Sequence, residues 1–191
     1  METRGTAREY YHGSPTGALS RLEPHSFCQR TPCVYLTANA VVAALYAVKP
    51  VEQPHSFYPY GFQGKVPVYT EYYPHALEDL YGGKTGYVYH CHCDAEISLE
   101  TDTANPCAMV SRKPVEVCGY MELLDVLEAL LEYERCGKLM VRRYDTLNWR
   151  QLEYIRLTVA EEIQKYRLKE TPSDKYSAFL RQRFPEVWNQ A

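Results

Sequence analysis

The chain has 191 residues, of which 46% are hydrophobic and 24% are charged, and these proportions are typical of one compact globular domain with its own core. No apolar run approaches the roughly 18 residues that span a bilayer, and the N-terminus shows neither the apolar region nor the cleavage site of a signal peptide. We therefore expect a cytoplasmic protein with no membrane partner. Its seven cysteines are irregularly spaced, which predicts reduced thiols rather than a disulfide scaffold.

The net charge of −3 is unevenly distributed along the chain. Residues 1–134 contain 9 Lys and Arg against 17 Asp and Glu, whereas residues 135–191 contain 12 against 7. A basic C-terminal region suits an anionic partner, and it equally suits solvated helix faces that bind nothing. The chain is less basic than a dedicated nucleic-acid-binding protein.

The first quarter of the chain alternates extended and helical patterns. Residues 9–11 predict a strand that runs into the turn His12-Gly13-Ser14-Pro15, because aromatic residues favour extended backbone and Gly-Ser-Pro ends it. A short helical stretch is expected over residues 19–22. Residues 33–36 predict a second strand, followed by a buried helix over residues 38–48 that the preceding threonine caps.

The middle of the chain begins with an aromatic segment. Residues 50–67 contain four prolines and four aromatic residues, which predicts an ordered loop because proline removes the donors that a strand needs. A short helix is expected over residues 74–81, an alternating strand over residues 86–94, and a turn over residues 101–106. Residues 114–117 predict one more strand.

The last third of the chain is predicted to be helical. Apolar residues recur at helical spacing over residues 123–131, and Gly137 is placed as the cap of that helix. Two further amphipathic helices are expected, so we predict an α+β fold with a core over residues 1–145 and a helical extension over residues 146–191. The residues expected to face inward are Leu152, Ile155, Val159 and Ile163 in the first of these helices, and Tyr176, Phe179, Leu180 and Phe184 in the second.

Three features of the N-terminal region occur in an order that is informative about function. His12-Gly13-Ser14 ends the first strand, Tyr35 lies in the second, and Tyr46 follows Tyr35 by eleven residues inside the predicted helix. With this order the sequence resembles the poly(ADP-ribose) polymerase and diphtheria-toxin-like branch of the ADP-ribosyltransferase superfamily. The resemblance covers about residues 10–47. It implies split antiparallel sheets with flanking helices, and NAD as a bound substrate.

The resemblance implies a role for each of these residues. The backbone of Gly13 lacks a neighbouring Cβ and would hydrogen-bond the nicotinamide carboxamide, with the Ser14 hydroxyl adding a further bond. His12 would contact ribose hydroxyls of the adenosine half. The rings of Tyr46 and Tyr35 would form the two walls around nicotinamide, while plain core packing of both tyrosines stays open.

The sequence departs from the family pattern beside Tyr35. Leu36 and Thr37 stand where the family has Phe-Ala, and Pro32-Cys33 precede Tyr35 where the family usually has glycine. We include Thr37 among the expected NAD-binding residues. These departures leave ring stacking intact and change the hydrogen bonds around nicotinamide.

Cleavage of an N-glycosidic bond passes through an oxocarbenium-like state, so the site needs a nearby carboxylate. Glu116 is the first candidate, because it lies between two valines on a late strand and would point away from their face. The family places its catalytic glutamate on such a strand. A surface role for Glu116 stays open, and Glu122 is the reserve candidate.

The run His90-Cys91-His92-Cys93 contains residue types that bind zinc. Strand alternation sends the two cysteines to one face and the two histidines to the other, so four ligands cannot converge from this stretch alone. We therefore predict no metal ligands here. The sequence also has no Ser-His-Asp order and no phosphate-binding glycine loop.

The leading hypothesis is a toxin-like glycosyltransferase that moves a single ADP-ribose unit from NAD to a protein or nucleic-acid acceptor. A non-catalytic NAD- or ADP-ribose-binding module, or a degenerate transferase, is the main alternative, and it depends on whether Glu116 acts. An RNA 2′-phosphotransferase is a further alternative with a related fold. It normally carries an added N-terminal lobe, whereas only eight residues precede the first predicted strand here.

Overall fold

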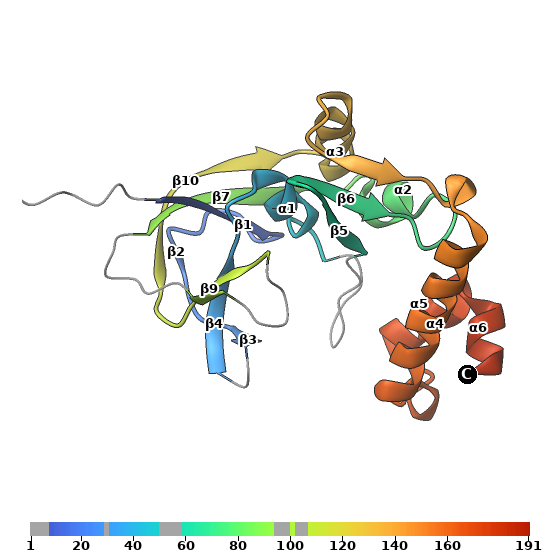
Figure 1. The fold of residues 1–191 in the computed structure, drawn as a ribbon. Coiled ribbons are helices and arrows are strands. Elements are labelled where there is room, and N and C mark those ends of the chain that lie inside the picture. Colours follow the sequence, from blue (N-terminus) through green and yellow to red (C-terminus); the bar gives the residue numbers. More distant parts are fainter. Residues whose placement is uncertain (1–7, 29–30, 50–58, 94–99, 102–106) are drawn as a thin grey trace, which may run out of the picture. The chain divides into compact units, whose positions relative to one another are not determined.

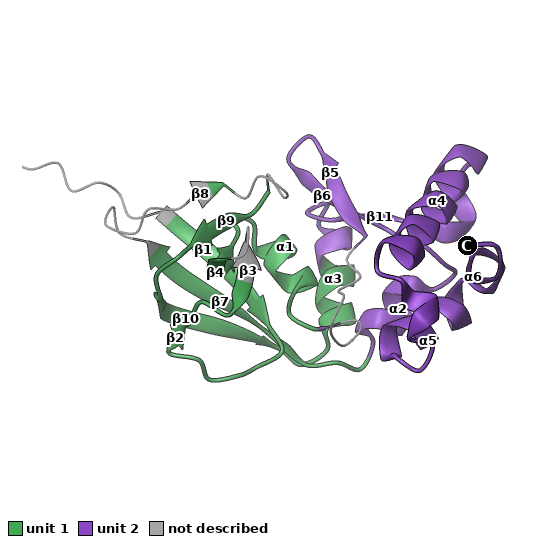
Figure 2. Cartoon of the chain, turned by 90° about the horizontal axis from the view of Figure 1, so that it is seen from below, with its two compact units in different colours: residues 1–48, 83–132 green, residues 49–82, 133–191 purple. Residues whose placement is uncertain are grey.

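The computed structural model describes residues 8–28, 31–49, 59–93, 100–101 and 107–191, and they form a mixed α+β fold (Figure 1). The chain divides into two compact units, coloured in Figure 2: unit 1 holds residues 1–48 and 83–132, and unit 2 holds residues 49–82 and 133–191. This division differs from the boundary expected at residue 145. None of the helices in the described ranges has the length and apolar character needed to cross a bilayer.

The first sheet of unit 1 has the strand order β1-β7-β10-β2, and every neighbouring pair is antiparallel (Figure 1). Its strands are β1 (Arg8–Ser14), β7 (Gly86–Cys93), β10 (Val115–Leu123) and β2 (Arg21–Leu22). The strands predicted over residues 9–11, 86–94 and 114–117 are therefore confirmed over residues 9–11, 86–93 and 115–117, and residue 94 lies outside the described residues.

The second sheet of unit 1 has the order β3-β4-β9-β8 and is also antiparallel. It is built from β3 (Ser26–Cys28), β4 (Thr31–Leu36), β9 (Met109–Ser111) and β8 (Glu100–Thr101). The two sheets meet where Tyr11 bridges to Thr37 through two backbone hydrogen bonds, with N···O distances of 2.7 and 2.9 Å. One edge of β1 therefore adjoins the chain that leaves β4.

The core of unit 1 is formed by side chains from one face of β1, β7 and β10, together with residues of β2 and β4. Alternate residues of a strand share a face, so Tyr10 of β1 and Tyr89 and Cys91 of β7 point into this core. The helix α1 (Ala40–Leu45) packs against the opposite face of β1 and β7. The buried core residues are Tyr10, Leu22, Val34, Leu36, Tyr89, Cys91 and Val115.

Two short helices in the first quarter differ from expectation. The helix predicted over residues 19–22 is wrong, because residues 19–20 are irregular and β2 occupies residues 21–22. The helix predicted over residues 38–48 is shorter, since α1 starts after Asn39. The Asn39 side chain accepts a hydrogen bond from the Val41 N–H at 2.9 Å and is the cap in place of Thr37.

Unit 2 contains a three-stranded sheet of order β11-β6-β5. Strands β5 (Tyr60–Gln63) and β6 (Val66–Thr70) form a hairpin, and β11 (Met140–Arg142) pairs with β6 in parallel. The loop predicted over the described part of residues 50–67 is therefore wrong from Tyr60 onward. Pro67 is tolerated because the pairing with β11 begins at Val68, so its missing N–H breaks no ladder bond.

The remaining helices are α2 (Ala76–Tyr81), α3 (Val126–Arg135), α4 (Trp149–Lys165), α5 (Lys175–Arg183) and α6 (Pro185–Gln190). Short 3-10 turns lie at Tyr144–Thr146 and Leu168–Glu170. Gly137, with a φ of 67°, follows α3 as its predicted cap. The periodicity of the last third predicted these faces well: the buried residues include Ile155, Val159, Ile163, Tyr176, Leu180 and Phe184.

Candidate functional site

The end of β1 holds His12 in one orientation. Its Nδ1 donates a hydrogen bond to the backbone carbonyl of Tyr35 on β4, at 2.8 Å. Burial lowers the pKa of His12 below its usual 6.5, although the hydrogen bond to Tyr35 acts in the opposite direction. The imidazole is therefore neutral near pH 7, with its proton on Nδ1, and Nε2 is left as a hydrogen-bond acceptor.

Gly13 lies directly against helix α1. A Cβ added to Gly13 would come within 1.9 Å of the Ala43 backbone oxygen and within 2.8 Å of the Tyr46 carbonyl carbon. Only glycine permits this approach, because the atoms it meets are backbone and cannot rotate away. The packing places the backbone of Tyr46, the residue that caps the C-terminal end of α1, next to His12 and Gly13.

The backbone of Gly13 faces an open edge of the sheet. In an antiparallel ladder the N–H and C=O groups of alternate residues point to the same side, and those of Tyr11 point to Thr37. The groups of Gly13 therefore point to that same edge. Within the described ranges no hydrogen bond is formed by Gly13 there, so a donor and an acceptor lie side by side without a protein partner.

The two hydroxyl residues of the predicted site have local structural roles. Ser14 is buried, and its Oγ accepts a hydrogen bond from the Thr16 N–H at 3.1 Å. Thr37 is buried as well, and its Oγ1 accepts from the Asn39 N–H at 3.2 Å. Each oxygen therefore orders the turn that follows its strand. The hydroxyl hydrogen of Ser14 remains a donor.

The two tyrosines differ in their surroundings. Tyr35 is half-buried and packs against Cys33 and Val110 of the second sheet. Tyr46 is half-buried at the end of α1, with its N–H bonded to the Ala43 oxygen at 3.0 Å. The structure thus brings together His12, Gly13, the carbonyl of Tyr35 and the backbone of Tyr46.

The two candidate carboxylates lie on opposite faces of β10. Glu116 pairs with Arg21 of β2, with 3.5 Å between the Arg21 Nε and a carboxylate oxygen, and its side chain is 74% exposed. It points away from the core that Val115 enters. Glu122 stands opposite Tyr87, which stands opposite Ser14 on β1, so Glu122 shares the face of His12 and Ser14.

A β-bulge explains this difference. Residues six apart share a face in a regular strand, but the register of β10 shifts between Val117 and Gly119, which inserts one extra residue. Because of this extra residue, the side chains of Glu116 and Glu122 lie on opposite faces of β10, whereas in a regular strand they would share one face. The Tyr87 hydroxyl donates to a carboxylate oxygen of Glu122 at 3.1 Å, and this hydrogen bond raises the pKa of Tyr87.

A row of tyrosines connects His12 with Glu122. The ring of Tyr89 lies 6.5 Å from the His12 ring and 5.7 Å from the Tyr120 ring, and Tyr120 lies 5.9 Å from Tyr87. The Tyr89 hydroxyl donates to the Thr16 carbonyl at 2.6 Å, which holds the loop after β1 against the sheet. Sequence reasoning missed this row, although the alternation of Tyr87 and Tyr89 was visible.

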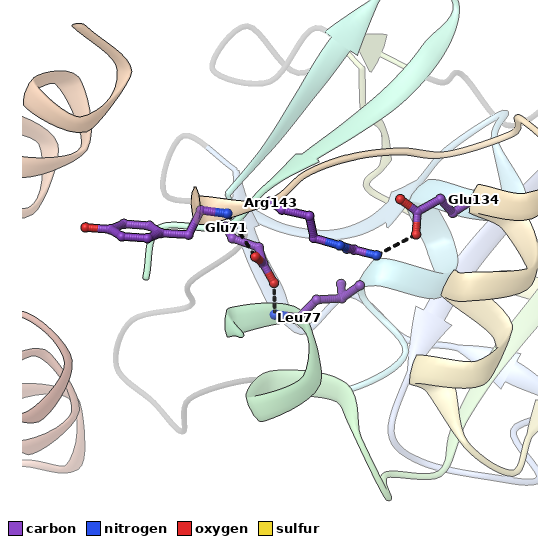
Figure 3. A network of polar contacts seen from close by, with 5 residues as sticks. Glu71, Leu77, Glu134 and Arg143 are labelled. Atoms are coloured by element: carbon purple, nitrogen blue, oxygen red, sulfur yellow. Dashed lines mark hydrogen bonds and ion pairs between the residues drawn. The ribbon is translucent and has the colours of Figure 1, made fainter. Parts of the chain in front are cut away.

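Unit 2 contains a buried carboxylate whose bonds are complete (Figure 3). Glu71 is 3% exposed, and its two oxygens accept from the backbone N–H groups of Leu77 at 3.2 Å and Tyr144 at 3.0 Å. Leu77 lies in the first turn of α2, whose N-cap residue His75 makes no side-chain cap. Glu71 therefore replaces the missing cap and has a structural role.

Unit 2 also contains a cavity of about 520 Å³. The residues that line it include two arginines, Arg142 and Arg150, and three aromatic residues, Tyr60, Phe62 and Tyr154. Phe57 and Tyr58, the other aromatic residues of the predicted loop, lie outside the described residues. Stacking surfaces beside positive charge suit flat anionic ligands.

Comparisons with known proteins do not assign a function to these sites. No protein-family model, no curated protein and no solved structure matches the chain.

Proposed function

We propose that unit 1 binds NAD at the open edge of β1 and transfers its ADP-ribose to an acceptor, with release of nicotinamide. The observation that carries the proposal is the pairing of a neutral, oriented His12 with the adjacent backbone donor and acceptor of Gly13. A planar carboxamide needs one acceptor and one donor at this spacing. The order of His12, Tyr35 and Tyr46 in the sequence supports the same function.

Each group has a distinct role in the proposal. The N–H and C=O of Gly13 bind the nicotinamide carboxamide, and His12 Nε2 accepts a hydrogen bond from a ribose hydroxyl. The ring of Tyr46 stacks on nicotinamide, and the Ser14 hydroxyl donates to the carboxamide oxygen. The bond between the ribose anomeric carbon and the nicotinamide nitrogen breaks, the acceptor atom bonds to that carbon, and the acceptor loses its proton.

We assign the carboxylate of this reaction to Glu122 rather than Glu116. Glu122 shares a sheet face with His12, and two strand spacings of about 4.8 Å separate β10 from β1. Tyr87 holds the Glu122 carboxylate in place, and the negative charge of that carboxylate stabilises the developing oxocarbenium ion.

For the acceptor, the cavity of unit 2 favours nucleic acid over protein. Its two arginines supply positive charge for phosphate, and its aromatic rings supply faces for bases. Residues 135–191 carry 12 Lys and Arg against 7 Asp and Glu, which agrees with an anionic acceptor.

The test is incubation of the protein with NAD labelled in its adenylate, with RNA, single-stranded DNA or cell protein as the acceptor. We expect label in nucleic acid and free nicotinamide in equal amount. Glu122→Gln is expected to lower turnover by about 10²-fold or more while NAD affinity is kept, and Glu116→Gln is the matched control on the same strand.

Three results would contradict parts of this proposal. NAD binding with no transfer to any acceptor would favour the non-catalytic NAD-binding module. Transfer that is lost in Glu116→Gln and kept in Glu122→Gln would return the carboxylate role to Glu116. Consumption of NAD only with 2′-phosphorylated RNA would favour the RNA 2′-phosphotransferase.

A further inference from the structure

A group of three metal-ligating side chains lies on the face of the first sheet opposite to His12. Glu9 of β1 stands opposite His92 of β7, and Tyr11 stands opposite His90, so the side chains of Glu9, His90 and His92 share one face. One carboxylate oxygen and one nitrogen from each histidine lie within 4.8 Å of one another.

The side chain of His90 packs on a neighbouring ring, and its Nε2 has no hydrogen bond among the described residues. Its ring stacks on Tyr11, with 5.5 Å between the ring centroids and 22° between the planes. Its Nε2 is buried without a hydrogen-bond partner in the described part of the chain, and the nearest carboxylate oxygen, of Glu9, is 3.6 Å away. A buried nitrogen without a partner costs free energy, and a metal ion would use its lone pair.

Two imidazoles and one carboxylate form a common ligand set for divalent transition metals. In a tetrahedral zinc site with bonds of about 2.1 Å, the ligand atoms lie about 3.4 Å apart. Small rotations of the exposed side chains would bring the three ligand atoms, now within 4.8 Å of one another, to that separation. The Glu9 side chain is 59% exposed and His92 is exposed, which leaves both free to rotate. Three protein ligands leave a fourth position open to water.

We propose that Glu9, His90 and His92 bind one divalent transition-metal ion of the zinc type, which crosslinks β1 to β7. The alternation of the His-Cys-His-Cys run places its histidines correctly, but the third ligand comes from the neighbouring strand. Cys91 is buried in the core on the other face and takes no part. The site shares no residue with the proposed transferase site, so the two proposals are independent of each other.

The test is titration of the untagged, metal-stripped full chain with Zn²⁺ and with Co²⁺, followed by calorimetry and visible absorption. We expect one ion per chain and an upward shift in thermal midpoint with metal. Co²⁺ is expected to show the d–d bands of nitrogen and oxygen ligands without thiolate charge transfer. Mg²⁺ is expected to bind at least tenfold more weakly than Zn²⁺.

Two of the three proposed ligands, Glu9 and His92, are exposed, so they are the positions chosen for substitution. His92→Ala and Glu9→Gln are expected to weaken Zn²⁺ binding by about 10²-fold or more, since loss of outer partners alone costs 10–100-fold. His25→Ala removes an exposed histidine of the same unit and is expected to leave binding unchanged. Circular dichroism with chelator present checks that all three variants are folded.

Unchanged zinc affinity in both His92→Ala and Glu9→Gln would overturn the proposal. Intense thiolate charge transfer with Co²⁺ would also overturn it, because the ion would then be held by cysteines. Absence of Zn²⁺ binding in the wild-type chain would do the same. NAD binding and transfer are measured in parallel, so a failed metal site and a failed transferase are distinguished.

Discussion

The buried carboxylate of Glu71 in unit 2 and the end of β1 in unit 1 differ in how their polar groups are bonded. In unit 2 both oxygens of the buried Glu71 accept backbone hydrogen bonds, and both oxygens of the exposed Asp79 are bonded, to the Tyr73 hydroxyl and to Arg183, each at 2.8 Å. In unit 1 His12 uses one ring nitrogen, and Gly13 presents a donor and an acceptor to an open edge. Complete bonding gives Glu71 a structural role, whereas the donor and acceptor left over at the end of β1 suit a ligand.

The largest effect is expected from Gly13→Ala. The added methyl group would meet the Ala43 backbone oxygen at 1.9 Å, so α1 must move away from β1. We expect the free energy of unfolding to fall by about 3 kcal/mol, the upper range for an overpacked core. Chemical denaturation measures this change.

Gly119→Ala is the matched control for Gly13→Ala, because no atom lies within 4 Å of the Cβ it would add. Its stability is expected to stay within about 0.5 kcal/mol of the wild type. Equal stability of the two variants would contradict the close packing of α1 on Gly13.

The complete bonding of Glu71 in unit 2 is tested by Glu71→Gln. The amide has one acceptor oxygen in place of two, so one of the two backbone N–H groups loses its partner. We expect a loss of about 2 kcal/mol in the free energy of unfolding, with the NAD affinity of the folded protein unchanged. The exposed Glu78→Gln on α2 is the control, and a loss of NAD affinity in Glu71→Gln alone would break the contrast between the units.

Tyr46→Ala tests whether the open edge of unit 1 includes an aromatic wall. If the ring stacks on nicotinamide, NAD affinity is expected to fall by about 1.5 kcal/mol, roughly tenfold. Tyr46→Phe keeps the ring and is expected to retain affinity. Calorimetric NAD titration distinguishes the two variants, and full affinity in a folded Tyr46→Ala protein would remove the ring from the site.

The smallest effect is expected from the titration of His12. Because burial lowers its folded-state pKa below the unfolded value of about 6.5, stability is fully present above about pH 6.5 and is lost as pH falls through the folded-state pKa. His12→Gln is expected to lack this part of the acid decline. Unfolding curves of both proteins between about pH 8 and pH 4.5 measure the difference, and parallel declines would contradict a buried neutral imidazole.

Local patterns in the sequence predicted much of unit 1 and the helical faces of unit 2. Alternation and caps depend on near neighbours, so the strand before His12 and the inward residues Ile155 and Val159 were predictable. The contact between His12 and the Tyr35 carbonyl was not, since it joins residues 23 apart in sequence. The order of the motifs along the chain identified His12 and Tyr35 as candidate site residues, but it did not predict this hydrogen bond.

Two features required the three-dimensional structure. The bulge in β10 reverses the faces of its residues, so Glu116 could not be distinguished from Glu122 by counting along the strand. The hairpin of β5 and β6 was hidden by the prolines around it. Gly64, with a φ of 61°, begins its two-residue turn and is the sequence signal that could have indicated the hairpin.

The parallel pairing of β11 with β6 has a consequence for synthesis on the ribosome. Val68 of β6 pairs with Met140 of β11, so the 71 residues from 69 to 139, including the last strand of unit 1, are made between the two partners. At about 5–20 residues per second, β6 waits about 4–14 s for this partner. We therefore expect nascent chains that end before residue 140 to expose the apolar edge of β6. Chaperones are expected to bind most strongly to chains of these lengths.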